Sequence, residues 1–253
     1  MYCPICQNES KHLFNTKYVQ VRQCLNASCQ HKFHGKSLPA GGVMDYSTSD
    51  SENFLIYQNR NFQMIDYLLN QGYVEPGSKV LDFGCGEGNI AQSFSDRNFD
   101  VTGVELSESG RTILDKRGLV NYPEIREIPP ERRFDLILMI EVIEHLELPL
   151  SLLQEAKNRL TEQGIIFVTT PCANSLKTRI VPEKAEPYRE PTHIQFFSSQ
   201  SLELCFQKAG FSKFKRFYLP WMIPNRSPLM KMLDRLLYGI DLNSHLTYFL
   251  FKE

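Results

Sequence analysis

The apolar positions of this chain fall into two repeating patterns. Short apolar runs of strand length alternate with segments in which apolar residues recur every three or four positions, the spacing of a helix packed on one face. Such alternation indicates an α/β fold built on a mostly parallel sheet. The runs predicted as strands are Val80–Phe83, Asp100–Val104, Phe134–Ile140, Ile165–Thr170, Phe211–Phe217 and His245–Phe251.

Helices are predicted in the intervals between these strands. They cover 54–72, 89–97, 107–116, 149–160 and 201–209, and a further short strand is expected between 117 and 134. Gln163-Gly164 predicts a turn before the strand that starts at Ile165. Residues 219–244 are interpreted as an insertion whose apolar stripe is expected to cover the core. The alternatives for this stripe are an acceptor pocket, a second subunit or a membrane surface; it contains Leu229, Met230, Leu233, Leu236 and Leu237.

Composition limits the classes of protein to consider. A chain of 253 residues that is 42% hydrophobic can bury a full α/β core and has room for a small accessory module. The net charge of −1 provides no basic field that would attract nucleic acid. No apolar run reaches the roughly 18 residues that would span a bilayer, and the N-terminus has no signal-peptide pattern. We therefore expect a cytoplasmic protein with reduced thiols.

Four of the seven cysteines lie in the first thirty residues. Cys3-x-x-Cys6 and Cys24-x-x-x-x-Cys29 form two short-spaced pairs, an arrangement that suits tetrahedral Zn²⁺. The bound metal would supply the folding energy that a small segment lacks. The segment resembles a zinc ribbon, although the second pair is wider than usual and leaves His31 and His34 as substitute ligands. We expect a ribbon-like module in residues 1–40 and a second domain in 41–253. Unmetallated thiols or a redox-active pair are the alternatives.

Three glycines alternate with other residues directly after the strand Val80–Phe83. A strand that enters a helix through such a turn leaves backbone amides at the helix N-terminus, where a ligand can approach closely. The next strand ends at Glu105, about 20 residues further on, where a carboxylate suits the hydroxyl pair of a ribose. We therefore expect a nucleotide-type cofactor here, with a plain turn as the alternative.

The glycine spacing, with Asp82 two places before it, resembles motif I of class I S-adenosylmethionine (SAM) methyltransferases. The run from Phe134 to Pro171, with Glu141-Val142-Ile143-Glu144-His145 after its first strand, is similar to a second motif of that family. The resemblance implies a Rossmann-like seven-stranded sheet with helices on both faces and an antiparallel last strand. It also implies that SAM is bound by Asp82, Gly84, Gly86, Gly88, Glu105, Leu106 and Ile140.

The carboxyl ends of strands face the ligand crevice in such sheets, which places Glu141, Glu144 and His145 beside SAM. His193 comes from a segment that resembles the histidine-bearing loop of the family. These four side chains suit Mg²⁺ or Mn²⁺, much as in methyltransferases of ubiquinone biosynthesis and of small-RNA 3′ ends, and such a metal would lower the pKa of a substrate hydroxyl. Alternatively, His145 or His193 is a metal-free base with a pKa near 6.5, or the residues are structural.

The resulting hypothesis is a SAM-dependent methyltransferase with a zinc ribbon. The reaction we expect is O-methylation of a small-molecule or glycan-type acceptor, with carbon or nitrogen as the alternative methylated atom. Alignment of the nucleophile with the methyl group and the sulfonium sulfur would supply most of the catalysis. RNA is a second possible acceptor, with the ribbon as a docking module, because Lys11, Lys17, Arg22, Lys32 and Lys36 make that segment basic. A non-enzymatic partner-binding protein is the third hypothesis, and the intact glycines argue against it.

Overall fold

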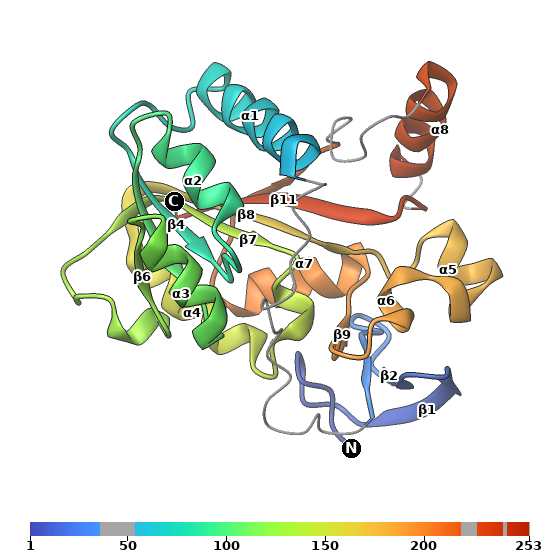
Figure 1. Ribbon diagram of the computed structural model, residues 1–253. Helices are drawn as coiled ribbons and strands as arrows, with labels where there is room; N and C mark the ends of the chain where they lie inside the picture. Colours follow the sequence, from blue (N-terminus) through green and yellow to red (C-terminus); the bar gives the residue numbers. More distant parts are fainter. Residues whose placement is uncertain (36–53, 219–226, 240–241, 253) are drawn as a thin grey trace.

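A seven-stranded sheet forms the centre of the computed structural model, which describes residues 1–35, 54–218, 227–239 and 242–252 (Figure 1). The strand order is β10-β11-β8-β7-β4-β5-β6. All neighbours in the run from β8 to β6 are parallel, whereas β11 is antiparallel to both β8 and β10. The predicted seven-stranded sheet is therefore confirmed; its strands are β4 (Lys79–Phe83), β5 (Asp100–Val104), β6 (Val120–Tyr122), β7 (Phe134–Ile140), β8 (Leu160–Pro171), β10 (Phe214–Arg216) and β11 (His245–Phe251).

The order of the strands reverses at the centre of the sheet. From β4 the chain proceeds outward to β5 and β6, and it then returns to β7 on the other side of β4. The loops that leave the carboxyl ends of β4 and β7 therefore run in opposite directions, which opens a crevice between them. The glycine turn follows β4, and the Glu-His motif follows β7.

Helices cover both faces of the sheet, as predicted. Along β7 the side chains alternate: Leu136 and Leu138 pack in the core on one face, whereas Ile137 and Met139 pack in the core on the other. The first core includes residues of α1 (Phe54–Asn70), α2 (Asn89–Ser95) and α3 (Glu108–Lys116). The second includes residues of α4 (Pro149–Arg159) and α7 (Ser199–Lys208).

Two predicted boundaries in this sheet were wrong. Gln163 and Gly164 do not form a turn but lie inside β8, which pairs with β7 from Leu160 onward through an irregular register. A side chain at Gly164 would lie 2.8 Å from the carbonyl oxygen of Phe134, so glycine serves a close backbone approach here. The strand predicted over Phe211–Phe217 is only three residues long.

The N-terminal segment folds as an antiparallel sheet of β1 (Ser10–Asn15), β2 (Gln20–Cys24) and β3 (Lys32–His34). Its fourth strand is β9 (Gln195–Phe196), which belongs to the larger domain and pairs with β3. In Figure 1 this sheet lies next to β9 and α6 (Glu186–Arg189). The predicted boundary at residue 40 falls outside the described residues.

The apolar stripe of α8 (Pro228–Gly239) does not cover the core. Its side chains at Leu229 and Leu236 are 69% and 60% exposed, and the helix projects from the body in Figure 1. The remaining short helices are α5 (Leu176–Ile180) and the 3₁₀ turns η2 (Ile125–Glu127), η3 (Ile143–His145) and η4 (Pro182–Lys184). Within the described part of the chain, no helix combines the length and apolarity needed to cross a membrane.

Candidate active site

The glycine turn after β4 is built for close packing as well as for ligand approach. Gly84 has a φ of +70°, and a Cβ atom there would lie 2.7 Å from a methyl group of Val142, which follows β7. Gly88 has a φ of +78°, and its Cβ would lie 2.3 Å from Leu114 of α3. Both positions therefore exclude side chains. The contact with Val142 also brings the two sequence motifs side by side.

Glu105 holds the glycine turn and the start of α3 together. Its Oε2 accepts a hydrogen bond of 2.8 Å from the amide of Gly86, and its Oε1 accepts one of 2.7 Å from the amide of Ser107. Ser107 in turn caps α3 by accepting a hydrogen bond from the Gly110 amide. A carboxylate has about four acceptor positions, so Glu105 retains acceptor capacity for ribose hydroxyls.

Asp82 is buried at the end of β4, and its Oδ2 has no hydrogen-bond partner. Burial raises the pKa of this carboxyl to about 7, and the neighbouring charge of Glu105 contributes to the increase. An unpaired buried oxygen is costly unless a ligand or water completes it. Asp82 is therefore a group that a cation at the glycine turn would stabilise in its charged form.

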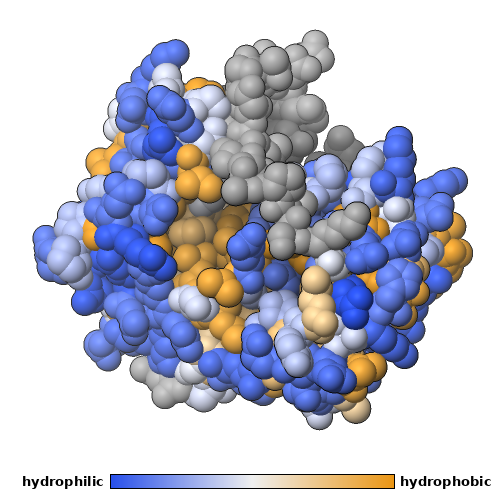
Figure 2. Space-filling model, turned by 90° about the horizontal axis from the view of Figure 1, so that it is seen from below, coloured by the Kyte–Doolittle hydropathy of each residue, from blue (hydrophilic) through white to orange (hydrophobic). Residues whose placement is uncertain are grey.

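The other two predicted cofactor residues differ in exposure. Leu106, directly after Glu105, is among the exposed large hydrophobic side chains, whereas Ile140 at the end of β7 is partly buried. On the face seen from below, the surface is hollowed, and much of the visible floor of the hollow is hydrophobic (Figure 2). A concave apolar surface is the usual form of a site for a small organic ligand.

Glu144, His145 and His193 converge beyond the end of β7. One ligand atom of each lies within 4.8 Å of the others, and the two imidazole centroids are 4.7 Å apart. His193 is brought there by the backbone, because the amide of Ile194 donates to the carbonyl oxygen of Glu144 at 2.9 Å. Glu144 and His193 are only 1% and 6% exposed, so they lie beneath the surface rather than at an open crevice mouth.

Hydrogen bonds fix the tautomers of both histidines. His145 Nδ1 lies 3.1 Å from the carbonyl oxygen of Thr192, and His193 Nδ1 lies 3.2 Å from that of Pro187. A carbonyl only accepts, so each Nδ1 must carry the proton. The Nε2 lone pairs are therefore free to accept a proton or bind a metal, an arrangement typical of metal-binding histidines.

Burial controls the charge of this group. Burial lowers the pKa of His145. Burial also lowers the pKa of His193 to about 4, and the nearby His145 contributes to that decrease. Burial raises the pKa of Glu144 well above its usual range, with a further contribution from the charge of Glu141. Glu144 Oε2 accepts from the Thr170 hydroxyl at 3.0 Å, whereas its buried Oε1 has no partner. A bound cation would supply the partner that this oxygen lacks.

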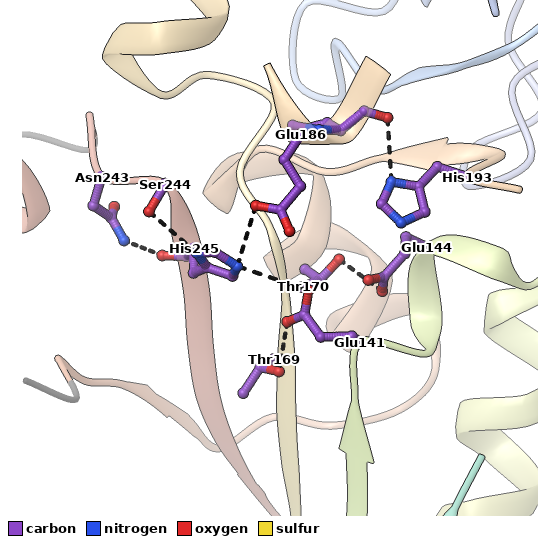
Figure 3. A network of polar contacts seen from close by, with 10 residues as sticks. Glu141, Glu144, Thr169, Thr170, Glu186, His193, Asn243, Ser244 and His245 are labelled. Carbon is purple, nitrogen blue, oxygen red and sulfur yellow. Dashed lines mark hydrogen bonds and ion pairs between the residues drawn. The ribbon is translucent and has the colours of Figure 1, made fainter. Parts of the chain in front are cut away.

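Glu141 points into a neighbouring group instead of joining the other three predicted residues (Figure 3). His245 Nε2 lies 3.8 Å from its Oε2 and 3.6 Å from Oε2 of Glu186. Glu141 also accepts a 2.8 Å hydrogen bond from the Thr169 hydroxyl and has a φ of +56°, which is unusual outside glycine. This backbone turn redirects the chain after β7.

Sequence reasoning missed four residues of these two groups: Thr169, Thr170, Glu186 and His245. The two threonines lie just before the last residue of β8, and His245 begins β11, so the strand pattern predicted where they lie in the sheet. Nothing in the sequence indicated that Glu186 would approach them. The pairing of β8 with both β7 and β11 brings the two threonines and His245 next to the end of β7.

The four N-terminal cysteines form one cluster, with sulfur atoms all within 4.8 Å of one another. The Cys3–Cys29 and Cys6–Cys24 sulfur separations are 3.8 and 3.4 Å. Tetrahedral zinc with Zn–S bonds of about 2.3 Å requires sulfurs about 3.8 Å apart, so the set fits this metal. A hydrogen bond from Cys29 lowers the pKa of Cys3 to about 5, whereas burial raises that of Cys24 to about 12.

The substitute ligand His31 is not part of the cysteine cluster. Its Nε2 lies 2.9 Å from Oε1 of Gln195, and its ring packs against Phe33 and Phe197. Burial lowers its pKa to about 4. His34 is the last residue of β3, pairs with Val21 of β2 and is not among the residues of the cluster. The cluster thus offers four thiol ligands, enough for a tetrahedral metal site without a histidine.

Comparison with known proteins identifies relatives for most of the chain. The family described as Methyltransferase domain matches residues 55–215. A ubiquinone biosynthesis O-methyltransferase of Glaesserella parasuis is 32% identical over 107 residues, which cover 37% of this chain and 45% of that protein. An (S)-coclaurine N-methyltransferase of Papaver somniferum is 29% identical over 191 residues, covering 69% and 52%. The chain thus spans about half the length of these curated relatives.

Solved structures share the fold at low sequence identity. A SAM-dependent methyltransferase from Archaeoglobus fulgidus superposes with a TM-score of 0.56 at 16% identity, covering 79% of this chain and all of that one. The plantazolicin methyltransferase BpumL, in complex with a desmethyl-plantazolicin analogue and SAH, has a TM-score of 0.55 at 16% identity, covering 80% and 86%. These similarities independently support the methyltransferase-like sheet described above.

Proposed function

This chain belongs to the methyltransferase domain family, and on that premise we propose that it transfers the methyl group of SAM to a hydroxyl oxygen of a small-molecule or glycan-type acceptor. The observation that carries the proposal is the convergence of Glu144, His145 and His193 beyond β7, next to the crevice between β4 and β7. Similarity to enzymes named for ubiquinone biosynthesis and for coclaurine supports a small organic acceptor.

In this proposal SAM lies along the carboxyl ends of β4 and β5. The turn from Gly84 to Gly88 receives the amino acid end, whose ammonium group would pair with the buried carboxyl of Asp82. Glu105 accepts the ribose hydroxyls, and Leu106 provides an apolar surface for the adenine. Ile140 supports the methyl end from β7.

The reaction is a direct displacement. The acceptor oxygen forms a bond to the methyl carbon as the carbon–sulfur bond breaks, and the acceptor proton moves to the free Nε2 of a histidine. His145 is the candidate base because it is the least buried of the three converging residues, and its Nδ1–H is held by the Thr192 carbonyl. Alignment of the reacting atoms supplies most of the rate.

The same three residues fit a divalent metal. Two imidazole nitrogens and one carboxylate, with an unpaired buried oxygen on Glu144, form a donor set that suits Mn²⁺ better than Mg²⁺, which prefers oxygen ligands. When bound, a metal would lower the pKa of the acceptor hydroxyl. Loss of activity in EDTA with recovery in Mn²⁺ supports this arrangement, and full activity in EDTA supports His145 as a metal-free base.

Zinc in the N-terminal module is proposed to be structural. Four thiol ligands would fill a tetrahedral shell and leave no position for a substrate. The module therefore supplies no reaction step of its own.

The acceptor class can be tested without knowing the acceptor. The protein is incubated with methyl-labelled SAM and with separate small-molecule, RNA and protein fractions of a cell extract. Label is expected in the small-molecule fraction and should be lost in His145→Ala, while the exposed His12 on β1 provides the matched control variant His12→Ala. Label that appears only in RNA would contradict the proposal.

RNA remains the second candidate acceptor because the ribbon is rich in basic residues. Two of them are engaged within the protein, however. Lys32 Nζ donates to the carbonyl of Ala173 and to Asn174, and Arg22 donates to Ser10. These contacts reduce the basic surface available for phosphates, which is why a small acceptor is preferred.

A further inference from the structure

The N-terminal sheet contacts the larger domain at the segment that carries His193. β3 pairs with β9, which begins two residues after His193. Between them lies Ile194, whose carbonyl accepts from the amide of His34 at 2.9 Å and whose amide donates to the carbonyl of Glu144 at 2.9 Å. One residue thus links the ribbon backbone directly to the candidate catalytic turn.

A second link runs through side chains. Gln195 Nε2 donates to the carbonyl of Leu146 at 2.9 Å, so its Oε1 must accept from Nε2–H of His31, also at 2.9 Å. His31 and Gln195 are 0% and 4% exposed. Leu146 directly follows the 3₁₀ turn η3, which contains Glu144 and His145. A buried and a partly buried hydrogen bond therefore connect the ribbon to the end of this turn.

We propose that His31 and Gln195 are positioning residues that hold the η3 turn and the His193 segment in a fixed relative position, so that the ribbon supports the active centre. The proposal rests on the proposed function, in which Glu144, His145 and His193 form that centre. It assigns the ribbon a task distinct from docking an acceptor. The same segment then gives His145 its tautomer, because Thr192 precedes His193 and accepts from His145 Nδ1.

The cofactor end of the site has separate supports. The glycine turn is held by Glu105, and α3 is held by Ser107, with no contact to the ribbon in these bonds. Removal of Gln195 leaves the buried His31 N–H and the partly buried Leu146 carbonyl without this partner, which favours rearrangement of the turn. Turnover should therefore fall while SAM binding is retained.

A matched pair of glutamines provides the test. Gln195→Met removes the link, whereas Gln200→Met removes an exposed bond from Gln200 Nε2 to the ribbon carbonyl of Ala27 that does not reach η3. In the full-length, zinc-loaded protein, kcat is expected to fall about tenfold or more in Gln195→Met, as for other residues that orient a site, with the KM for SAM within about twofold. Gln200→Met should match the wild type.

The nitrogen-15 spectra of the histidine rings provide a readout that does not depend on turnover. The wild type should show Nδ1–H tautomers for His145 and His193, and Gln195→Met should show mixed tautomers for one or both. Retained tautomers together with retained kcat, or equal effects of the two variants, would overturn the proposal. A wild type that binds SAM but transfers no methyl group would refute the proposed function alone, because the tautomer comparison would still decide the inference.

A variant that fails to fold does not end the test. His31→Phe keeps an aromatic ring between Phe33 and Phe197 and removes only the donor to Gln195. The same change in tautomers is expected in this variant. Wild-type spectra and turnover in a folded His31→Phe protein would refute the positioning role.

Discussion

Asp82→Asn should make the SAM-free protein more stable at neutral pH. The Asp82 carboxyl is fully buried, its pKa is raised to about 7 by that burial, and one of its oxygens has no partner. Asparagine has nearly the same shape and stays neutral at every pH. It also keeps a carbonyl oxygen that accepts the hydrogen bond from the Ala91 backbone.

The size of the effect follows from the difference between the folded and unfolded pKa values. Well below pH 3.8, Asp82 is protonated in both the folded and the unfolded state, and its titration does not change the free energy of unfolding. As the pH rises toward 7, the unfolded chain loses the proton at a pKa near 3.8 while the folded protein retains it. The free energy of unfolding then decreases by about 1.36 kcal/mol per pH unit. The total is about 4 kcal/mol as an upper limit, lost by pH 7 and constant above it.

Urea unfolding of wild type and Asp82→Asn at several pH values between 5 and 8 measures this difference. Comparing the two proteins at the same pH cancels the titration of all other groups. The stability advantage of the variant should grow with pH, and Asp115→Asn, an exposed helix substitution, controls for the loss of a surface charge. An advantage that is independent of pH would refute the assignment of a buried, protonated carboxyl.

The cofactor prediction adds a second consequence for Asp82. If the ammonium group of SAM pairs with this carboxylate, SAM binding should release a proton near pH 6, where the free protein holds it. Calorimetry in buffers of different ionisation enthalpy detects such a proton. Proton release that persists in Asp82→Asn would assign it to another group.

Three further outcomes test the remaining site assignments. Glu105→Ala should weaken SAM binding by roughly 1.5–3 kcal/mol for each charge-assisted hydrogen bond lost, and equal calorimetric affinity of variant and wild type would refute the role of Glu105. Purified protein should contain one zinc ion, and Cys3→Ser combined with Cys6→Ser should release it; metal analysis that finds no zinc in protein prepared without chelator would refute the ribbon. If His193, the alternative to His145, is the metal-free base, the acidic limb of the pH–rate profile should lie well below the usual histidine pKa of about 6.5, because burial lowers the pKa of His193 to about 4. A limb at 6.5 would contradict this.

The last of these predictions differs from what the sequence alone predicts. A histidine in a loop is expected to titrate near its ordinary pKa, and the sequence contains no sign that His193 is buried. The structure places it beside His145 and beneath the surface, where charge is disfavoured. Glu144 is buried as well, whereas the sequence predicted that its side chain faces the ligand crevice.

The sequence by itself determined which segments form most strands of the large sheet. The strand-like runs at 100–104, 134–140 and 245–251 coincide with β5, β7 and β11, because strands buried on both faces are rich in apolar and β-branched residues. The glycine turn and the spacing of the cysteines were also readable, since backbone conformation and metal geometry restrict the residues that can occupy them.

Only the tertiary structure decided how segments distant in the sequence meet. The pairing of β3 with β9 makes the ribbon part of the support for His193, and no local pattern records a two-residue strand such as β9. The separation of the Glu141 and Glu144 side chains depends on the left-handed backbone of Glu141 and on the approach of Glu186 and His245 toward Glu141. Local patterns report propensity and burial within one element, whereas these contacts depend on the positions of several elements at once.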